Sequence, residues 1–181
     1  MAAIIAALAA VVGVLVAARQ MRQTAQLSRF TLGLEALLRL KAEWTSEEMQ
    51  RKKRRAAFLL LVEKPDVGSS VADILDFFET VAVLLKREVI DEYLTWHTFY
   101  WWMVNFYAAS QHYIGSKRST EGEKQWRDLE DVIPILKRIE GVTELPTPDE
   151  TQRFLDDERG DYKDPAVAPL PGGLQASSDE E

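Results

Sequence analysis

The sequence contains no cysteine and only two histidines. The lack of cysteine excludes disulfides, thiolate metal sites, cysteine nucleophiles and lipid attachment through a cysteine. His97 and His112 have no carboxylate at ligand spacing, and the sequence contains no H-E-x-x-H, Glu-x-x-His, G-x-S-x-G or phosphate-loop pattern. We therefore predict no metal, no cofactor and no enzymatic activity, and an enzyme without a recognisable motif remains the alternative.

No polar side chain interrupts residues 2–18, which read AAIIAALAAVVGVLVAA. A helix of this length spans roughly 25 Å, close to the lower limit for crossing a hydrocarbon core of about 30 Å. Arg19 and Arg22 follow the run and no Lys or Arg precedes it, so the positive-inside rule predicts an outer N-terminus and a cytoplasmic remainder. We assign residues 1–19 to a single-pass transmembrane anchor in the lipid bilayer. The residues assigned to the anchor include Ile4, Ile5, Leu8, Val11, Val12, Gly13, Leu15 and Arg19.

Two other interpretations of this run stay open, namely a secretory signal peptide and a buried helix of a soluble protein. A signal peptide requires positive charge before the apolar core, and no Lys or Arg precedes this run. The second is favoured by the eight alanines among the seventeen residues, since alanine contributes little to insertion. Ala9, Gly13 and Ala17 recur every four residues, a spacing that allows two anchors to pack closely, so a homo-oligomer formed through the anchor is one expected partner.

Charge divides the chain into two unequal parts. Residues 1–64 carry 11 Lys/Arg and 5 Asp/Glu, whereas residues 65–181 carry 11 and 24. Residues 142–181 hold five of the seven prolines and 11 Asp/Glu against 3 Lys/Arg, which predicts a disordered acidic tail. A short helix after Thr147, with Phe154 and Leu155 docked, is the one exception we expect there. Residues 20–141 remain as a cytoplasmic helical bundle domain.

Apolar residues recur three and four positions apart along residues 20–141, and no alternating strand pattern occurs. The fold class is therefore predicted as all-α, with the anchor helix continuing into a bundle of four to five helices. The anchor helix is expected to continue to Trp44, and a Thr45–Glu48 capping box should open a second helix to about Val62. A third helix should start at Ser69 or Ser70, and a fourth should extend from Asp91 to Gly115. A Thr120–Glu123 capping box should open a fifth helix to Gly141, with a kink at Pro134. Gly33 is a further candidate for a bend.

The candidate partner surface combines a basic run with two tryptophans, and its residues are Arg51, Lys52, Lys53, Arg54, Arg55, Trp101 and Trp102. A solvated helix face, attraction to lipid and nucleic-acid binding all compete for the basic run. Its estimated distance of about 25 to 30 Å from the headgroups exceeds the screening length of about 8 Å, so lipid attraction is negligible unless the helix lies flat. The acidic domain argues against nucleic acid.

Adjacent tryptophans cannot share one face of a helix, so one of the pair is expected to face a partner or a second layer, although the aromatic helix could also line a cavity for a lipid or cofactor. A further hypothesis concerns the tail, whose net charge is −8. It folds back on the basic run and competes there with an acidic partner.

Several short motifs occur in one order along the chain: Asp73-Ile74-Leu75-Asp76-Phe77-Phe78-Glu79, then Leu84 and Leu85, Val89-Ile90-Asp91-Glu92, and an aromatic helix with Phe99 and Trp102. With Trp44 before a charged helix, this order resembles a bacterial family of small membrane-anchored helical proteins, domain of unknown function 4760, over roughly residues 1–140. The resemblance implies a helical fold at the inner membrane of a bacterium and carries over no catalytic or binding residue.

Together these features predict a protein-interaction or scaffold module at the inner face of the bacterial membrane, with an unknown protein partner. A membrane-perturbing or pore-forming protein is the second alternative, beside the enzyme named above.

Overall fold

The computed structural model describes residues 2–64 and 69–163, with side chains in these ranges except at positions 2–18, 22, 23, 25 and 26. The described residues form helices and connections without a strand, as the fold-class prediction requires. The helices are α1 (Ala2–Trp44), α2 (Glu47–Leu61), α3 (Ser70–Lys86), α4 (Glu92–Ala109), α5 (Gln111–Glu121), α6 (Arg127–Glu140) and α7 (Pro148–Arg159). The described part thus holds more helices after α1 than the four to five we expected.

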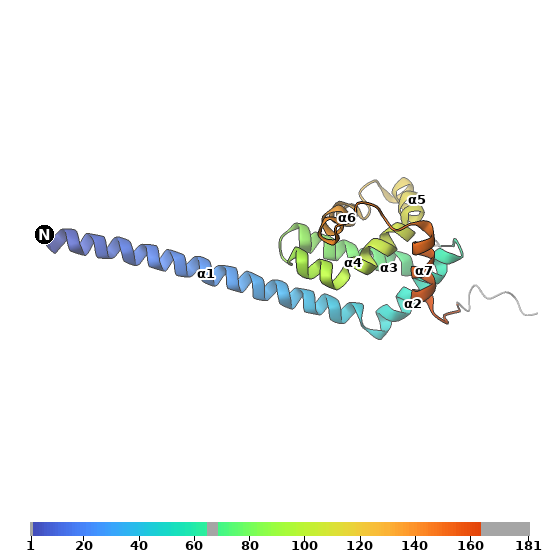
Figure 1. Ribbon diagram of the computed structural model, residues 1–181, viewed down its shortest axis with the longest axis horizontal. Coiled ribbons are helices and arrows are strands. Elements are labelled where there is room, and N and C mark those ends of the chain that lie inside the picture. Colours follow the sequence, from blue (N-terminus) through green and yellow to red (C-terminus); the bar gives the residue numbers. More distant parts are fainter. Residues whose placement is uncertain (1, 65–68, 164–181) are drawn as a thin grey trace, which may run out of the picture.

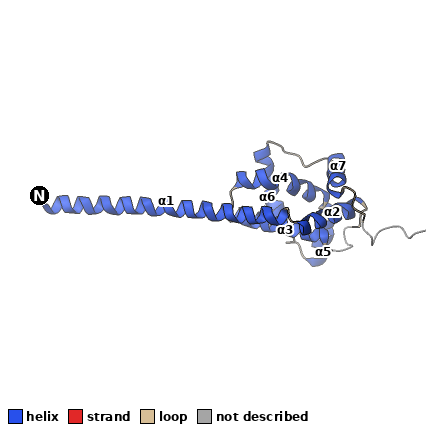
Figure 2. Ribbon diagram, turned by 90° about the horizontal axis from the view of Figure 1, so that it is seen from below, coloured by secondary structure: helices blue, strands red, loops and turns tan. Residues whose placement is uncertain are grey.

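Helix α1 extends far beyond the bundle formed by the other helices (Figures 1 and 2). Its backbone is continuous from the predicted anchor to Trp44, which confirms the predicted continuity. The anchor side chains Ile4 to Leu15 lie outside the described ones. Within the part of the chain that the structure describes, no helix has both the length and the apolar character needed to cross a membrane.

Gly33 allows α1 to approach the turn between α3 and α4, and it does not end or interrupt the helix. A Cβ atom at this position would collide with the carbonyl oxygen of Val89. The close approach also covers Ile90, which is buried. Packing between backbones is therefore what requires a glycine at this position.

The core is centred on Trp44, the last residue of α1, which is only 2% exposed. Its ring lies 5.0 Å from that of Phe77 and 4.8 Å from that of Phe78, both on α3. The rings of Trp102 and Phe106 on α4 complete the cluster at 5.8 and 6.4 Å. Trp44 therefore joins the long helix to the domain, and α3 and α4 pack around it.

Several helix boundaries differ from the prediction, beginning with the start of α2. Ser46 caps α2 by accepting a hydrogen bond from the backbone N–H of Met49. The hydroxyl of Thr45 instead bonds back to the carbonyls of Lys41 and Ala42 at the end of α1. The predicted Thr45–Glu48 capping box is thus absent, and a simple cap at Ser46 opens α2 instead, because Thr45 satisfies the preceding helix.

The aromatic helix also ends earlier than predicted. Asp91 caps α4 as expected, accepting from the N–H of Leu94 at 2.9 Å. The helix then breaks at Ser110, and Gly115 lies inside α5 instead of ending a helix. The break turns Tyr113 and Ile114 into the core, where both are buried.

Helix α6 begins after Trp126, which has a left-handed backbone conformation, and not at Thr120. The hydroxyl of Thr120 bonds within α5. The α6 N-terminus is capped from α3, where the Glu79 carboxylate accepts from the N–H groups of Asp128 and Leu129 at 3.2 and 2.7 Å. A carboxylate from another helix here replaces the local cap. Pro134 lies inside α6, which continues through it to Glu140.

Part of the predicted tail belongs to the folded domain. Thr147 and Glu150 form the capping box that opens α7, and Phe154 and Leu155 are buried, as predicted for a short helix. Helix α7 packs against α2 and α4. Residues 164–181 of the predicted tail lie outside the described residues.

Candidate functional site

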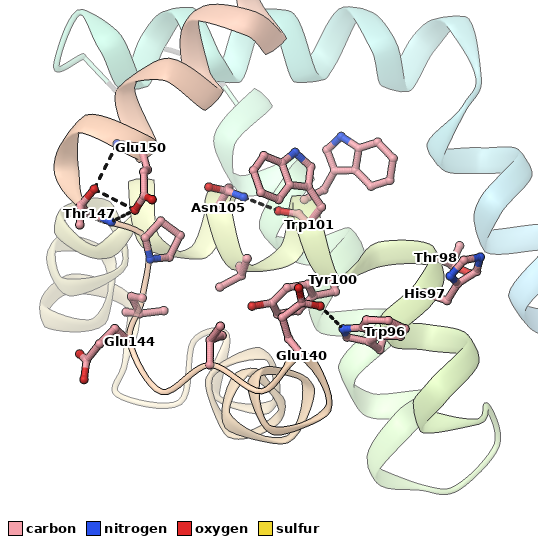
Figure 3. Close-up of a pocket in the computed structure, with 15 residues that line it drawn as sticks. Trp96, His97, Thr98, Tyr100, Trp101, Asn105, Glu140, Glu144, Thr147 and Glu150 are labelled. Carbon is pink, nitrogen blue, oxygen red and sulfur yellow. Dashed lines mark hydrogen bonds between the residues drawn. The ribbon is translucent and has the colours of Figure 1, made fainter.

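An aromatic cleft lies between α4 and the segment that joins α6 to α7 (Figure 3). Its volume is about 600 Å³, within the range of ligand pockets. The residues that we use to define the aromatic cleft are Trp96, Tyr100, Trp101 and Val104 on α4, Glu140 on α6, and Val142, Glu144, Leu145, Pro146, Thr147 and Glu150 beyond it.

Hydrogen bonds fix both walls of the aromatic cleft. The Trp96 indole N–H donates to the Glu140 carboxylate at 2.8 Å and so ties α4 to the end of α6. On the other wall, Glu150 accepts from the backbone N–H and the hydroxyl of Thr147, each at 2.8 Å. The side chain of the buried Asn105 donates to the Trp101 carbonyl at 2.7 Å, within the helix (Figure 3). The cleft is therefore a formed feature of the fold.

The lining of the aromatic cleft has acidic groups and no Lys or Arg. Hydrogen bonds from Thr147 lower the pKa of the Glu150 carboxyl below its usual value, which keeps it ionised at neutral pH. Burial, together with the nearby Glu140 charge, raises the pKa of the Tyr100 phenol, which stays protonated. An apolar surface with a negative rim suits a ligand that is both apolar and positively charged.

Trp101 is the most exposed large side chain of the aromatic cleft, at 60%. Its ring still contacts that of Phe154 on α7, at 6.2 Å between centroids. An exposed indole held by a packed neighbour is typical of the aromatic anchors found at protein interfaces.

The basic run Arg51 to Arg55 does not form one surface. Arg51 and Arg54 are exposed, and Arg55 is half-buried. Lys52 pairs with Glu48 and Asp73, at 3.1 and 3.4 Å. Only part of the run is thus available at the surface of the described chain.

Lys53 lies in the core, 3% exposed. Its Nζ is 4.5 Å from the centroid of the Trp44 ring and 5.5 Å from that of Trp102, with the Glu158 carboxylate at 3.9 Å. Burial lowers the pKa of the Lys53 ammonium, and the Glu158 charge opposes this shift. Trp102 therefore contacts the core and α7 and also borders the aromatic cleft, which its neighbour Trp101 lines with an exposed ring.

The carboxylates of α3 have structural partners. Asp73 pairs with Lys52, Asp76 accepts from the Trp126 indole at 2.7 Å, and Glu79 caps α6.

His97 lies at the edge of the aromatic cleft and His112 is exposed on α5. Over residues 2–64 and 69–163, no group of three His, Cys, Asp or Glu side chains is placed to hold a metal ion.

The side chains of the predicted anchor residues lie outside the described ones, except that of Arg19, which is exposed. Conversely, the wall of the aromatic cleft formed by Glu144 to Thr147 was missed, because its proline and acidic residues were assigned to the tail. The Thr147–Glu150 capping box was the available signal that the chain is ordered there.

A family model described as "Domain of unknown function (DUF4760)" matches residues 2–133. No curated protein and no solved structure matches the chain. The family match includes α1 to α5 and the first half of α6, and it ends before the connection to α7.

Proposed function

We propose that this chain, which belongs to the family of the domain of unknown function DUF4760, is a protein-interaction module at the inner face of a bacterial membrane and is not an enzyme. The aromatic cleft is the observation that supports this proposal. Its partner is a protein segment that places a large apolar side chain against Trp101 and carries Lys or Arg residues beside it.

Charge and exposure both support this kind of partner. Glu140, Glu144 and Glu150 line the aromatic cleft without a cationic neighbour among the lining residues. A basic segment gains from the field of these carboxylates as it approaches, while an acidic one is repelled. The exposed Trp101 ring supplies both apolar contact area and a face for a cation.

The apolar run over residues 2–18 supports the membrane location, together with Arg19 and Arg22 after it. Helix α1 is in close contact with the domain at Gly33, and the stretch from Arg19 to Gly33 spans roughly 20 Å. Membranes should retain the protein during a carbonate wash, and protease added outside intact spheroplasts should leave the domain uncut. Release of the intact protein by carbonate would contradict the anchor.

The cleft is tested with short fluorescent peptides that carry a central Trp between Lys and Arg residues, titrated into the detergent-solubilised full chain. Trp101→Ala and Glu144→Lys should each weaken binding by about tenfold or more, the effect of losing a hot-spot contact. Tyr93→Ala is the matched control for Trp101, since Tyr93 is an equally exposed aromatic of α4 that does not line the cleft.

A second peptide with Glu in place of each Lys and Arg separates charge recognition from nonspecific apolar adhesion. It should not bind the wild-type chain. Equal binding of both peptides, or unchanged binding by the Trp101→Ala and Glu144→Lys variants, would refute the proposed function of the cleft.

A further inference from the structure

One face of α1 carries apolar side chains that the rest of the described chain leaves exposed. The opposite face contacts the domain through four buried residues, Gly33, Leu37, Leu40 and Trp44. Since a helix turns by about 100° per residue, Leu27, Thr31 and Leu38 point away from that contact. Leu27 is 68% exposed and Leu38 is 57% exposed. In Figure 1, helices α3 to α7 lie on one side of α1, and its other side stays open.

The exposed residues of this face follow a regular spacing. We name them the α1 seam, and its members are Gln20, Thr24, Leu27, Thr31, Leu34 and Leu38, all exposed. Successive members are four, three, four, three and four positions apart. A repeated alternation of four and three is the heptad pattern of helices that wind around each other. The α1 seam therefore fits one partner helix that lies alongside α1.

The two threonines make the α1 seam more apolar than their hydroxyl groups suggest. Thr24 Oγ1 donates to the Gln20 carbonyl at 3.0 Å, and Thr31 Oγ1 donates to the Leu27 carbonyl at 2.9 Å. Both hydroxyl donors are thus satisfied within the helix, and burial against a partner leaves neither of them unpaired. The other polar member, Gln20, carries a donor and an acceptor on one amide, so it can pair with the same residue of a second copy.

Charge selects a second copy of this chain as the partner helix. When two identical helices lie parallel and in register, each seam residue meets the same residue of the other helix, and a charge there would be repelled by its equivalent. None of the six seam residues is charged. Glu35, beside the seam, pairs with Arg39 of its own helix at 2.6 Å. The seam ends before Lys41, which occupies the next heptad position.

The parallel orientation follows from where the domain is attached. The domain packs on the C-terminal part of α1, at Gly33, Leu37 and Trp44. An antiparallel pair would place each domain next to the N-terminal apolar run of the other copy, whereas a parallel pair places both domains at one end. Two copies anchored in one membrane must also be parallel. This orientation, unlike the pairing itself, rests on the membrane location proposed above.

We propose that α1 pairs with α1 of a second copy along the α1 seam, parallel and in register. The contact lies after the predicted anchor, so it is separate from any packing through Ala9, Gly13 and Ala17. The residues that line the aromatic cleft belong to α4, α6 and the segment after α6 and not to α1, so the pairing leaves the cleft open. The dimer thus carries two clefts, and a partner with two basic segments gains from binding both.

Cysteine cross-linking tests the contact directly, because the chain has no cysteine of its own. The variants Thr24→Cys, Leu27→Cys and Thr31→Cys are oxidised mildly as detergent-solubilised full chains. Each should form an intermolecular disulfide about tenfold or more faster than Leu32→Cys, because only seam positions bring two equivalent Cα atoms within disulfide range. Leu32 is the matched control, since it is 60% exposed and lies outside the seam. Equal rates at Leu27 and Leu32, or a seam variant that fails to cross-link, would overturn the proposal.

Like charges in the α1 seam provide the second test. Leu27→Lys places two ammonium groups against each other in the dimer, so the dimer dissociation constant should rise about tenfold or more. Leu32→Lys adds the same charge at a comparably exposed position and should dimerise as wild type does. Sedimentation equilibrium in detergent measures both constants, and circular dichroism should show unchanged helix content for both variants.

Two outcomes of the sedimentation experiment contradict the pairing. A wild-type chain that is monomeric would overturn the proposal outright. If Leu27→Lys dimerised as tightly as Leu32→Lys, the dimer would form through the anchor alone, and the α1 seam would have no part in it. Binding of the basic peptide to the aromatic cleft should be the same in Leu27→Lys as in wild type, so loss of the dimer and loss of the cleft are measured separately.

Discussion

Lys53 Nζ lies 4.5 Å from the ring centroid of Trp44, so a cation and the central indole of the core are in direct contact. Trp44 ends α1 and Lys53 lies in α2. Through Glu158, the same lysine reaches α7. One contact pair thus links α1, α2 and α7.

Trp44→Ala should lower the free energy of unfolding by about 3–5 kcal/mol, the usual result of truncating a fully buried tryptophan. The loss is large because four aromatic neighbours, Phe77, Phe78, Trp102 and Phe106, pack against the ring. Leu32→Ala, at an exposed position of the same helix, should change stability by less than about 0.5 kcal/mol. Denaturant unfolding of both variants measures the difference, and similar values would contradict the central role of Trp44.

Gly33→Ala and Gly115→Ala should change stability in opposite directions. At Gly33 the added methyl group meets the Val89 carbonyl, so α1 must shift, and we expect a loss of about 1–3 kcal/mol. At Gly115, inside α5, no atom lies within 4 Å of the added group. Alanine there should therefore stabilise by about 0.4–1 kcal/mol, since it reduces the freedom of the unfolded chain. Thermal unfolding of the two variants tests the pair, and a stabilising Gly33→Ala would exclude the close approach.

Local signals in the sequence were sufficient to predict the caps at Asp91 and Thr147. In both cases a side chain bonds to a backbone N–H three residues later, within one turn. The all-α class follows from helical spacing for the same reason, because the period of a helix is visible in any short window. The signals that succeeded all act between residues close in the sequence.

The boundaries that were mispredicted depend on residues far apart in the sequence. The cap of α6 comes from Glu79, about fifty positions earlier, and no local pattern around Thr120 reports it. The end of α4 at Ser110 reflects the burial of Tyr113 and Ile114. Tertiary packing thus overrides local propensity at these positions.

The candidate site was partly predictable in the same sense. Adjacent positions on a helix require that Trp101 and Trp102 diverge, and the structure places Trp101 in the aromatic cleft and Trp102 toward Lys53. Composition could not reveal that Lys53 leaves the basic run for the core. Its burial depends on α7, which brings Glu158 to it across a long stretch of chain.

Glu79→Gln removes the charge from the α6 cap and leaves one of the two oxygens that accept there. Burial raises the pKa of the Glu79 carboxyl above its usual 4.5, even though the cap hydrogen bonds oppose this shift. The folded state therefore takes up this proton before the unfolded state does. As the pH falls through the raised pKa toward 4.5, wild type should gain stability relative to Glu79→Gln.

Glu150→Gln provides the comparison with the opposite sign, since hydrogen bonds from Thr147 lower the pKa of the Glu150 carboxyl. The stability that Glu150 contributes is present above its unfolded pKa and is lost as the pH falls through the lowered value. Denaturant unfolding from neutral to acidic pH should give slopes of opposite sign for the two variants relative to wild type. Slopes of the same sign would exclude the burial of Glu79 as the cause.

Lys53→Met keeps most of the length of the side chain and removes its charge. Burial lowers the pKa of Lys53 below the usual 10.5, so the folded state releases this proton before the unfolded state does. Between the lowered pKa and 10.5, wild type should therefore gain stability relative to Lys53→Met as the pH rises.

Lys52→Met is the matched control on the next residue of α2. The hydrogen bond to Glu48 raises the pKa of Lys52, so the stability that Lys52 contributes is present below 10.5 and is lost as the pH rises through the raised value. Denaturant unfolding at pH values below and above 10.5 should show the two differences moving in opposite directions, the Lys53 difference below 10.5 and the Lys52 difference above it. If Lys53→Met gave the same trend as Lys52→Met, Lys53 would be solvated like its neighbour, and its burial against Trp44 would be excluded.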